Sequence, residues 1–184
     1  MNAQLARLAL VAVLAGSAAL AACNTMTSSK ALPPLELAPE VNIPRFMGDW
    51  YVIANIPTFV EKGAHSARES YVLQPDGTIA TTFSFRADGF DGPPKDYHSK
   101  GIVLGEHGAV WGQQYLWPFK ADYRISYVAP DYSQTVITRE KRDYVWIMAR
   151  TPTISEADLK KLTELVARQG YDLSKLQRVP QKGA

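Results

Sequence analysis

Short β-branched and aromatic runs, separated by turn residues, dominate the middle of the sequence and constrain its fold most. Eight such runs lie between Asp49 and Arg150, one about every 13 residues. They cover residues 49–57, 67–74, 78–86, 97–104, 109–117, 122–129, 132–138 and 143–150. Their short links favour consecutive antiparallel strands, and Pro75-Asp76-Gly77 predicts a hairpin between the second and third runs. We therefore expect an all-β fold, an eight-stranded antiparallel up-and-down β-barrel, which is the strand number that closes around one small ligand; a seven-stranded sandwich is the alternative.

The periodicity becomes helical after Pro152. Ser155 is the predicted N-cap of a helix that ends at Gly170. One face of this helix is apolar and carries Leu159, Leu162, Leu165 and Val166. We expect a single C-terminal α-helix packed on the outside of the barrel. A membrane-surface role is the weaker alternative, because the polar face mixes both signs of charge.

The first 22 residues have the pattern of a secretory signal peptide. Arg7 precedes an uncharged apolar stretch from Leu8 to Leu20, which as a helix would span about 20 Å, less than a bilayer core of about 30 Å. The next residues, Leu20-Ala21-Ala22-Cys23, resemble the bacterial lipobox, in which the signal is removed and the cysteine is lipidated. The alternative is an ordinary signal that is cut after an Ala-x-Ala site, with Cys23 incidental.

The residues after Cys23 predict where the chain is attached. Asn24 follows Cys23, and the absence of Asp there favours the outer membrane, so we expect a lipid-anchored protein that faces the periplasm. Residues 24–40 are rich in Ser, Thr, Pro and Ala, so residues 23–43 are expected to form a lipidated N-terminus followed by an extended tether. Residues 44–184 then form the folded domain.

Composition and missing motifs exclude several classes of protein. Lys and Arg number 20 against 18 Asp and Glu, and a net charge of +2 is too small for a generic nucleic-acid binder. One cysteine excludes a disulfide framework and a cysteine zinc cluster. No serine-nucleophile elbow, phosphate loop or His-Glu-x-x-His motif occurs, and His65, His98 and His107 are scattered. We therefore expect no enzyme activity, no cofactor and no metal.

Three motifs in order give the chain a family resemblance. They are Gly48-Asp49-Trp50-Tyr51 at the first strand, Asp131-Tyr132 in a late loop, and Arg150 at the end of the eighth strand. With the lipobox and the helix, they resemble the lipocalin family and within it the bacterial lipoprotein lipocalins; Pro130 departs from the family pattern, which has Thr there. The resemblance implies that Arg150 stacks on the Trp50 ring at a closed barrel end, and that Gly48 frees the backbone before the strand.

Strand alternation and the resemblance together predict a ligand cavity. Trp50 sets the phase of the first strand, which points Val52 and Ala54 inward. The inward side chains expected to contact a ligand are Val52, Tyr71, Phe83, Phe85, Trp111, Gln113, Tyr115 and Trp117. Glu69 is an acid on the same inward face, with Tyr71, Tyr115, Arg68 or Arg124 as its possible partner, and it is a possible polar ligand contact. The alternative is that these large side chains simply fill the barrel.

The resemblance implies non-enzymatic binding, storage or transport of small hydrophobic ligands in the bacterial envelope. Fatty acids and lysophospholipids are the expected ligands, and the membrane is contacted through the N-terminal lipid anchor. A homodimer is possible, because barrels of this kind can pair through an open end. The alternatives are a structural envelope lipoprotein with a filled barrel and, less favoured, a lipid-modifying enzyme.

Overall fold

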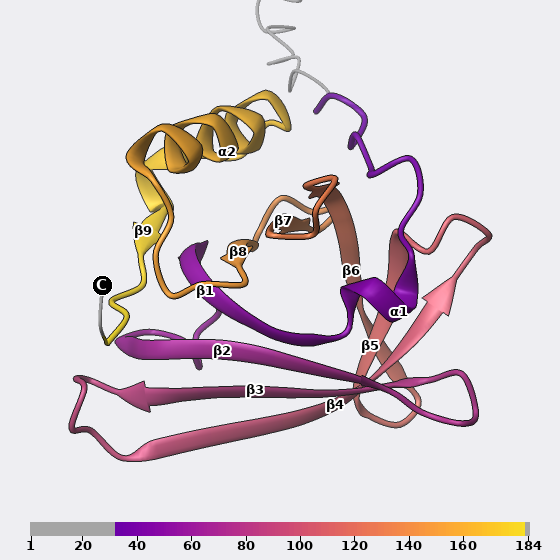
Figure 1. Cartoon of the computed structure of the whole chain (residues 1–184), viewed down its shortest axis with the longest axis horizontal. Coiled ribbons are helices and arrows are strands. Elements are labelled where there is room, and N and C mark those ends of the chain that lie inside the picture. The colour runs from indigo at the N-terminus through magenta and orange to yellow at the C-terminus, as the bar shows by residue number, and fades with distance from the viewer. Residues whose placement is uncertain (1–31, 183–184) are drawn as a thin grey trace, which may run out of the picture. The chain divides into compact units, whose positions relative to one another are not determined.

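Eight antiparallel strands follow one another around a closed barrel in the computed structural model, which describes residues 32–182 (Figure 1). The strands are β1 (Gly48–Ile56), β2 (Ala64–Leu73), β3 (Ile79–Ala87), β4 (Pro94–Leu104), β5 (Val110–Leu116), β6 (Phe119–Val128), β7 (Gln134–Thr138) and β8 (Val145–Ala149). Each strand pairs with the next, and β1 pairs with both β8 and β2. The predicted up-and-down barrel is confirmed, and the sandwich alternative is excluded.

The turn between β2 and β3 shows how local sequence sets the register. Asp76 accepts hydrogen bonds from the Thr78 backbone N–H at 3.0 Å and the Thr78 hydroxyl at 2.6 Å, and Gly77 has φ +78°. This is a conformation that glycine adopts without strain. The predicted hairpin is therefore present, with Leu73 opposite Ile79.

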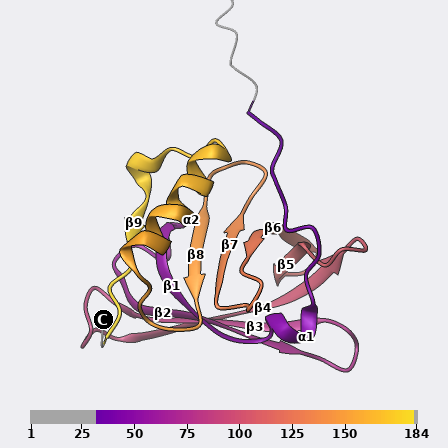
Figure 2. The same ribbon diagram turned by 45° about the horizontal axis from the view of Figure 1, so that its top comes forward.

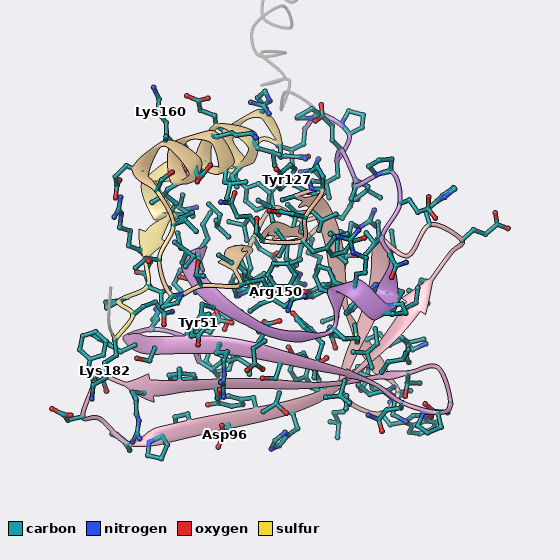
Figure 3. The ribbon with its side chains drawn as sticks, in the orientation of Figure 1. Tyr51, Asp96, Tyr127, Arg150, Lys160 and Lys182 are labelled. Carbon is teal, nitrogen blue, oxygen red and sulfur yellow. The ribbon has the colours of Figure 1, made fainter. Side chains whose placement is uncertain are left out.

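The C-terminal helix α2 (Glu156–Arg168) lies against the outer face of β8 (Figure 2). The Ser155 hydroxyl caps it by accepting from the Asp158 N–H at 3.0 Å. Leu162 and Val166 are buried in an outer core, whereas Lys160 points away from the barrel (Figure 3). The predicted helix is confirmed in place and in orientation. Within residues 32–182, no helix has both the length and the apolar character needed to cross a membrane.

A bulge in β1 changes which side chains face inward. The pairing of β1 with β8 shifts between Val52 and Ala54. As a result Val52 packs in the barrel interior, while Ile53 and Ala54 pack in the outer core under α2. The expectation that Ala54 points inward is therefore wrong, because one extra residue in a strand reverses the alternation beyond it.

The C-terminal segment closes the seam between β1 and β2. It contains a short 3-10 helix, η1 (Leu173–Lys175), and a strand, β9 (Gln177–Arg178), that pairs with β1. The buried Gln181 amide then donates to Val52 O at 2.8 Å and to Ala67 O at 3.0 Å. These backbone groups need a partner, since the ladder between β1 and β2 stops at Tyr51. Elements this short carry no periodic sequence signal.

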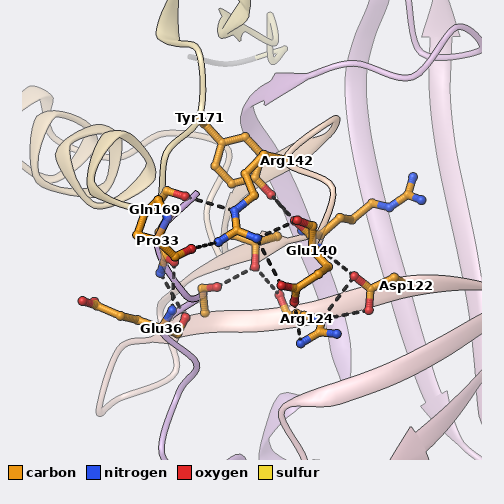
Figure 4. Close-up of polar contacts among 11 residues, drawn as sticks. Pro33, Glu36, Asp122, Arg124, Glu140, Arg142, Gln169 and Tyr171 are labelled. Carbon is orange, nitrogen blue, oxygen red and sulfur yellow. Dashed lines mark hydrogen bonds and ion pairs between the residues drawn. The ribbon is translucent and has the colours of Figure 1, made fainter. Parts of the chain in front are cut away.

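Residues 32–42, called the N-terminal strap below, pack along the barrel and lead into α1 (Ile43–Phe46). Ala38 N–H donates to Ile125 O and Val41 N–H donates to His107 O, each at 2.9 Å. Figure 4 shows the beginning of the strap, where the Arg142 guanidinium donates to Pro33 O. An extended tether was expected over residues 23–43. The part of it that the structure describes, residues 32–43, is instead hydrogen-bonded to the barrel wall. Cys23 and residues 1–22, the expected signal peptide, lie outside the described residues.

Candidate functional site

The Arg150 guanidinium holds together the end of the barrel where β1 begins. Its carbon lies 3.8 Å from the centre of the Trp50 ring. Its nitrogens donate to Asp49 O at 2.8 Å and to Arg45 O at 2.9 Å. Gly48 has φ +92°, and a Cβ there would lie 3.4 Å from the same guanidinium. These residues form the wall of the barrel end and leave no room for a ligand between them.

The loop between β6 and β7 fastens α1 to this end. Asp131 accepts from the Ser133 N–H at 3.0 Å, which shapes the turn. Tyr132, at φ +61°, accepts a hydrogen bond from the Asn42 N–H at 2.8 Å through its hydroxyl, and Arg45 lies 4.2 Å from its ring centre. Asp131 and Tyr132 are therefore structural contacts at the barrel end.

Aromatic side chains fill the half of the interior next to α1. Phe46, Trp50, Tyr71 and Trp111 are at most 1% exposed, and their ring centres lie 5.0 to 5.7 Å apart in contacting pairs. The Trp111 indole donates to Gly108 O at 2.7 Å. This aromatic plug makes that end of the barrel a closed one.

The other half of the barrel encloses a cavity of about 380 Å³. Loops alternate between the two ends of an up-and-down barrel, so the β1–β2, β3–β4, β5–β6 and β7–β8 loops surround the end opposite α1. The cavity lies at that open end and is lined by Thr58, Phe59, Val60, Glu61, Glu69, Thr81, Phe83, Tyr97, Ser99, Gln113, Tyr115, Ala121, Asp122, Tyr123, Arg139 and Trp146.

The residues expected to contact a ligand fall into two groups. Glu69, Phe83, Gln113 and Tyr115 line the cavity. The others lie elsewhere: Val52, Tyr71, Phe85 and Trp111 are buried away from its lining, and Trp117 is 81% exposed.

Two physical reasons separate the second group from the cavity. Tyr71 and Trp111 belong to the plug, and strand alternation cannot tell the plugged half of a barrel from the hollow half. Trp117 lies at the tip of the β5–β6 hairpin, beyond a register shift between Gln113 and Leu116. Alternation along β5 therefore does not extend to it.

Glu69 is buried next to two tyrosines. It accepts a hydrogen bond from the Tyr71 hydroxyl, which lies 2.5 Å from the Tyr123 hydroxyl. Burial, and secondarily the charge of Glu61, raises the pKa of Glu69 to about 8, so the carboxyl is mostly protonated at neutral pH. Of its possible partners Tyr71 is the one found.

The two arginines considered for Glu69 pair with other acids. Arg68 lies 3.1 Å from Asp49, and Arg124 lies 2.9 Å from Asp122. Neither cation is thus available to hold Glu69 ionised, which agrees with its raised pKa.

Glu61 is a second buried acid at the cavity, and no sequence pattern indicated it. It lies on the β1–β2 loop and accepts from Asn55 Nδ2 at 3.1 Å, the Thr58 N–H at 3.0 Å and the Trp146 indole at 3.2 Å. Burial raises the pKa of Glu61, and these donors act against the rise. The loop folds back over the open end, so no spacing in the sequence connects Glu61 with Trp146.

Arg139 is the cavity's one lining cation, and it too was missed. Its side chain is 18% exposed, and its Nε lies 3.4 Å from Asp143 without forming a hydrogen bond. The Thr58 hydroxyl, also in the lining, has no hydrogen-bond partner either. Buried polar groups normally have partners, so these two mark a place suited to the polar end of a ligand.

No cluster of three or more metal-ligating side chains occurs in the part of the chain that the structure describes.

A barrel plugged at one end, with an aromatic-lined cavity at the other, defines a class of proteins that hold a small hydrophobic molecule. Comparison with known proteins agrees with this class. A family model described as a lipocalin-like domain matches residues 41–181. The chain therefore belongs to the lipocalin family, whose members bind or carry small hydrophobic ligands and are typically not enzymes.

Individual relatives cover most of the chain. Temperature-induced lipocalin-1 of Arabidopsis thaliana is 33% identical over 80% of this chain and 83% of its own length. The protein named outer membrane lipoprotein Blc of Escherichia coli K12 is 27% identical over 91% of this chain and 96% of its own. Among solved structures, insecticyanin of Manduca sexta superposes with a TM-score of 0.64 at 12% identity, covering 83% of this chain and 87% of that one. The last comparison shows the fold alone.

Proposed function

We propose that this protein binds one single-chain lipid, a fatty acid or a lysophospholipid, and stores or carries it in the bacterial envelope. The cavity at the open end is the observation that supports the proposal. Its volume of about 380 Å³ is in the range of small-ligand sites, toward the lower limit. Phe83 and Trp146 offer apolar surface for an acyl chain, and each buried methylene contributes about 0.8 kcal/mol.

The polar groups of the cavity favour one orientation of the lipid. Arg139 and the Thr58 hydroxyl come from loops at the open end and have hydrogen-bonding capacity to spare. Glu69 lies deeper and is mostly neutral near pH 7, so it does not repel an apolar tail as a buried carboxylate would. The carboxylate or phosphate of the lipid then meets Arg139, and the tail extends toward Phe83 and Gln113.

The proposal places the protein on the outer membrane, facing the periplasm and attached through lipidated Cys23. Two observations support this location: the lipobox-like Leu20-Ala21-Ala22-Cys23, and relatives that are named outer membrane lipoproteins and match most of the chain. Metabolic labelling with palmitate tests the attachment. Label is expected on the wild-type protein and not on Cys23→Ser, and label that persists in Cys23→Ser would overturn it.

Lipid extraction and native mass spectrometry of the protein purified from its own membrane test ligand binding. One acyl lipid per barrel is expected, with micromolar or tighter affinity for a fluorescent fatty acid. Ala121→Trp fills the cavity and is expected to weaken binding by about tenfold or more. Ala80→Trp, on the exposed face of β3, is the matched control. A wild-type barrel that is empty by mass spectrometry and does not bind the fluorescent lipid would refute the proposal.

The same experiments separate the alternatives. A filled barrel would bind nothing, and the cavity argues against it. An enzyme would change the lipid, whereas we expect the lipid to be recovered chemically unchanged after prolonged incubation. Pairing of two barrels through their open ends is examined by sedimentation with and without lipid.

A further inference from the structure

Five apolar side chains at the open end are more exposed than any other large hydrophobic residue that the structure describes. They form the apolar rim, which consists of Phe59 (81%), Tyr115 (64%), Leu116 (70%), Trp117 (81%) and Phe119 (73%). Phe59 lies on the β1–β2 loop, and the other four lie at the tip of the β5–β6 hairpin. Because Phe59 and Tyr115 both line the cavity, the apolar rim borders the cavity entrance.

This concentration is unusual for a surface that faces only water. Single exposed apolar residues are normal, but several large ones in one place mark an interaction surface. A role in lining the cavity does not account for all of the apolar rim, since Trp117 and Phe119 lie outside the lining. Nor do the hairpin strands require them, because a turn that joins two strands is usually built from small and polar residues.

The chemistry of the apolar rim suits a phospholipid surface. Trp, Tyr and Phe are the side chains that favour the boundary between membrane and water. Each of the two loops that carry the apolar rim also carries an exposed lysine. Lys62 lies on the β1–β2 loop near Phe59, and Lys120 lies next to Phe119. Cations beside inserted aromatics are complementary to anionic lipid head groups.

The path of the N-terminal strap brings the same end of the barrel close to a membrane. Pro33 O accepts from Arg142, and the Glu36 backbone bonds with the Gln169 side chain, as Figure 4 shows. Arg142 belongs to the β7–β8 loop, which also supplies Arg139 to the cavity. From there the strap runs to the closed end, where Val41 bonds with His107. The chain therefore enters its described part at the level of the open end.

The short distance in sequence between Cys23 and the strap sharpens this point. Nine residue steps separate Cys23 from Leu32, and they reach at most about 30 Å even when fully extended. A lipid on Cys23, which is part of the proposed function, thus holds the open end within about 30 Å of the bilayer. An anchor entering at the closed end would have allowed the opposite orientation.

We propose that the apolar rim docks on the phospholipid surface of the membrane, so that a lipid moves between bilayer and cavity without crossing water. The rim aromatics lie at the head-group level, Lys62 and Lys120 contact the head groups, and the cavity entrance faces the acyl chains. A second copy of the chain on the same surface is the competing occupant.

Tryptophan fluorescence gives a direct test on the full-length protein reconstituted in vesicles of phosphatidylcholine and phosphatidylglycerol. Of the four tryptophans, Trp50, Trp111 and Trp146 are buried and Trp117 is exposed. Lipids brominated on their acyl chains are expected to quench Trp117 and shift its emission to the blue, and Trp117→Ser is expected to abolish both effects. No quenching of the wild-type protein by any brominated lipid would overturn the proposal. Quenching needs no bound ligand, so its failure is distinct from a failure of lipid binding.

The transfer of a fluorescent fatty acid from donor vesicles to the barrel tests the consequence. The double variant Trp117→Ser/Phe119→Ser is expected to slow transfer by about tenfold while leaving the equilibrium affinity near the wild-type value. Val72→Ser/Leu73→Ser, an exposed apolar pair on β2 outside the cavity, is the matched control and should transfer at the wild-type rate. Unchanged transfer in the rim variant would contradict the proposal. So would loss of a dimer in that variant without any quenching of the wild type, which would assign the rim to a second copy.

Discussion

The Arg150 guanidinium lies over the Trp50 ring, with 3.8 Å between its carbon and the ring centre, although Trp50 belongs to the first barrel strand and Arg150 follows the last. The same guanidinium donates to the backbone carbonyl groups of Asp49 and Arg45. The side chain of Arg150, the residue that follows β8, thus joins the end of β8 to β1 and α1. The plug beneath it is held in place by a planar cation that uses both its face and its edge.

Replacing Arg150 with lysine is expected to lower the free energy of unfolding by about 2–3 kcal/mol, because an ammonium group can neither stack nor reach several carbonyls at once. Urea unfolding followed by tryptophan fluorescence measures the change. Arg168→Lys, on the exposed side of α2, is the control and should stay within about 0.5 kcal/mol of the wild type. An Arg150→Lys variant as stable as this control would contradict the role assigned to the stack.

Glu69 makes stability depend on pH. Its pKa is about 8 in the folded protein against 4.5 as the ordinary value, so the folded state favours the protonated form. The resulting stabilisation is complete below about pH 4.5 and is lost as the pH rises through about 8. Glu69→Gln cannot ionise and should therefore flatten the decline in unfolding free energy between these pH values.

Urea midpoints at several pH values, for the wild type, Glu69→Gln and the exposed control Glu106→Gln, measure this effect. The control should decline with pH as the wild type does. Parallel curves for the wild type and Glu69→Gln would show that Glu69 is ionised in the folded protein.

Gln169 fastens the N-terminal strap. Its buried side chain accepts from the Glu36 N–H at 2.9 Å and donates to Glu36 O at 3.0 Å. Gln169→Ala should speed hydrogen exchange of the Glu36 amide by about tenfold, because that amide loses its acceptor. The Val41 amide, bonded to His107 O, should exchange at an unchanged rate. Equal acceleration at both amides would mean that the strap opens as one unit.

Arg139 should distinguish acidic from neutral ligands. Arg139→Gln removes the charge at the cavity and is expected to weaken fatty-acid binding by about tenfold, while the fatty alcohol of the same chain length binds as before. Isothermal titration with both ligands gives the comparison, and Lys141→Gln on the same loop is the control. Equal losses for acid and alcohol would place the head group elsewhere.

Sequence patterning predicted the strands, the hairpin and the outer helix, because each depends on local periodicity and turn chemistry. Inward-facing residues were predicted well where a strand is regular, as for Phe83 and Gln113. The bulge in β1 and the register shift in β5 reversed or ended the alternation for Ala54 and Trp117. A bulge depends on how neighbouring strands pair, and that is absent from the pattern of a single strand.

The cavity itself needed the tertiary structure. Glu61 and Arg139 lie on loops whose positions depend on long-range contacts. Trp146 is 85 residues from Glu61, and Tyr171 is 32 residues from Arg139. The strap was expected to be part of a tether because the segment that contains it is rich in Ser, Thr, Pro and Ala. Its bonds to Ile125 and Gln169 show that composition alone does not decide whether a segment finds hydrogen-bond partners.

Period-two and helical patterns specify which elements form, so the sequence by itself predicted eight antiparallel strands and one outer helix. Closure into a barrel became certain only when β1 was seen to pair with both β8 and β2. Tertiary structure alone decided which half of the barrel is filled and which is hollow. Inward side chains look alike along a strand, and only the packing of Phe46, Trp50 and Trp111 against one another leaves the cavity at the other end.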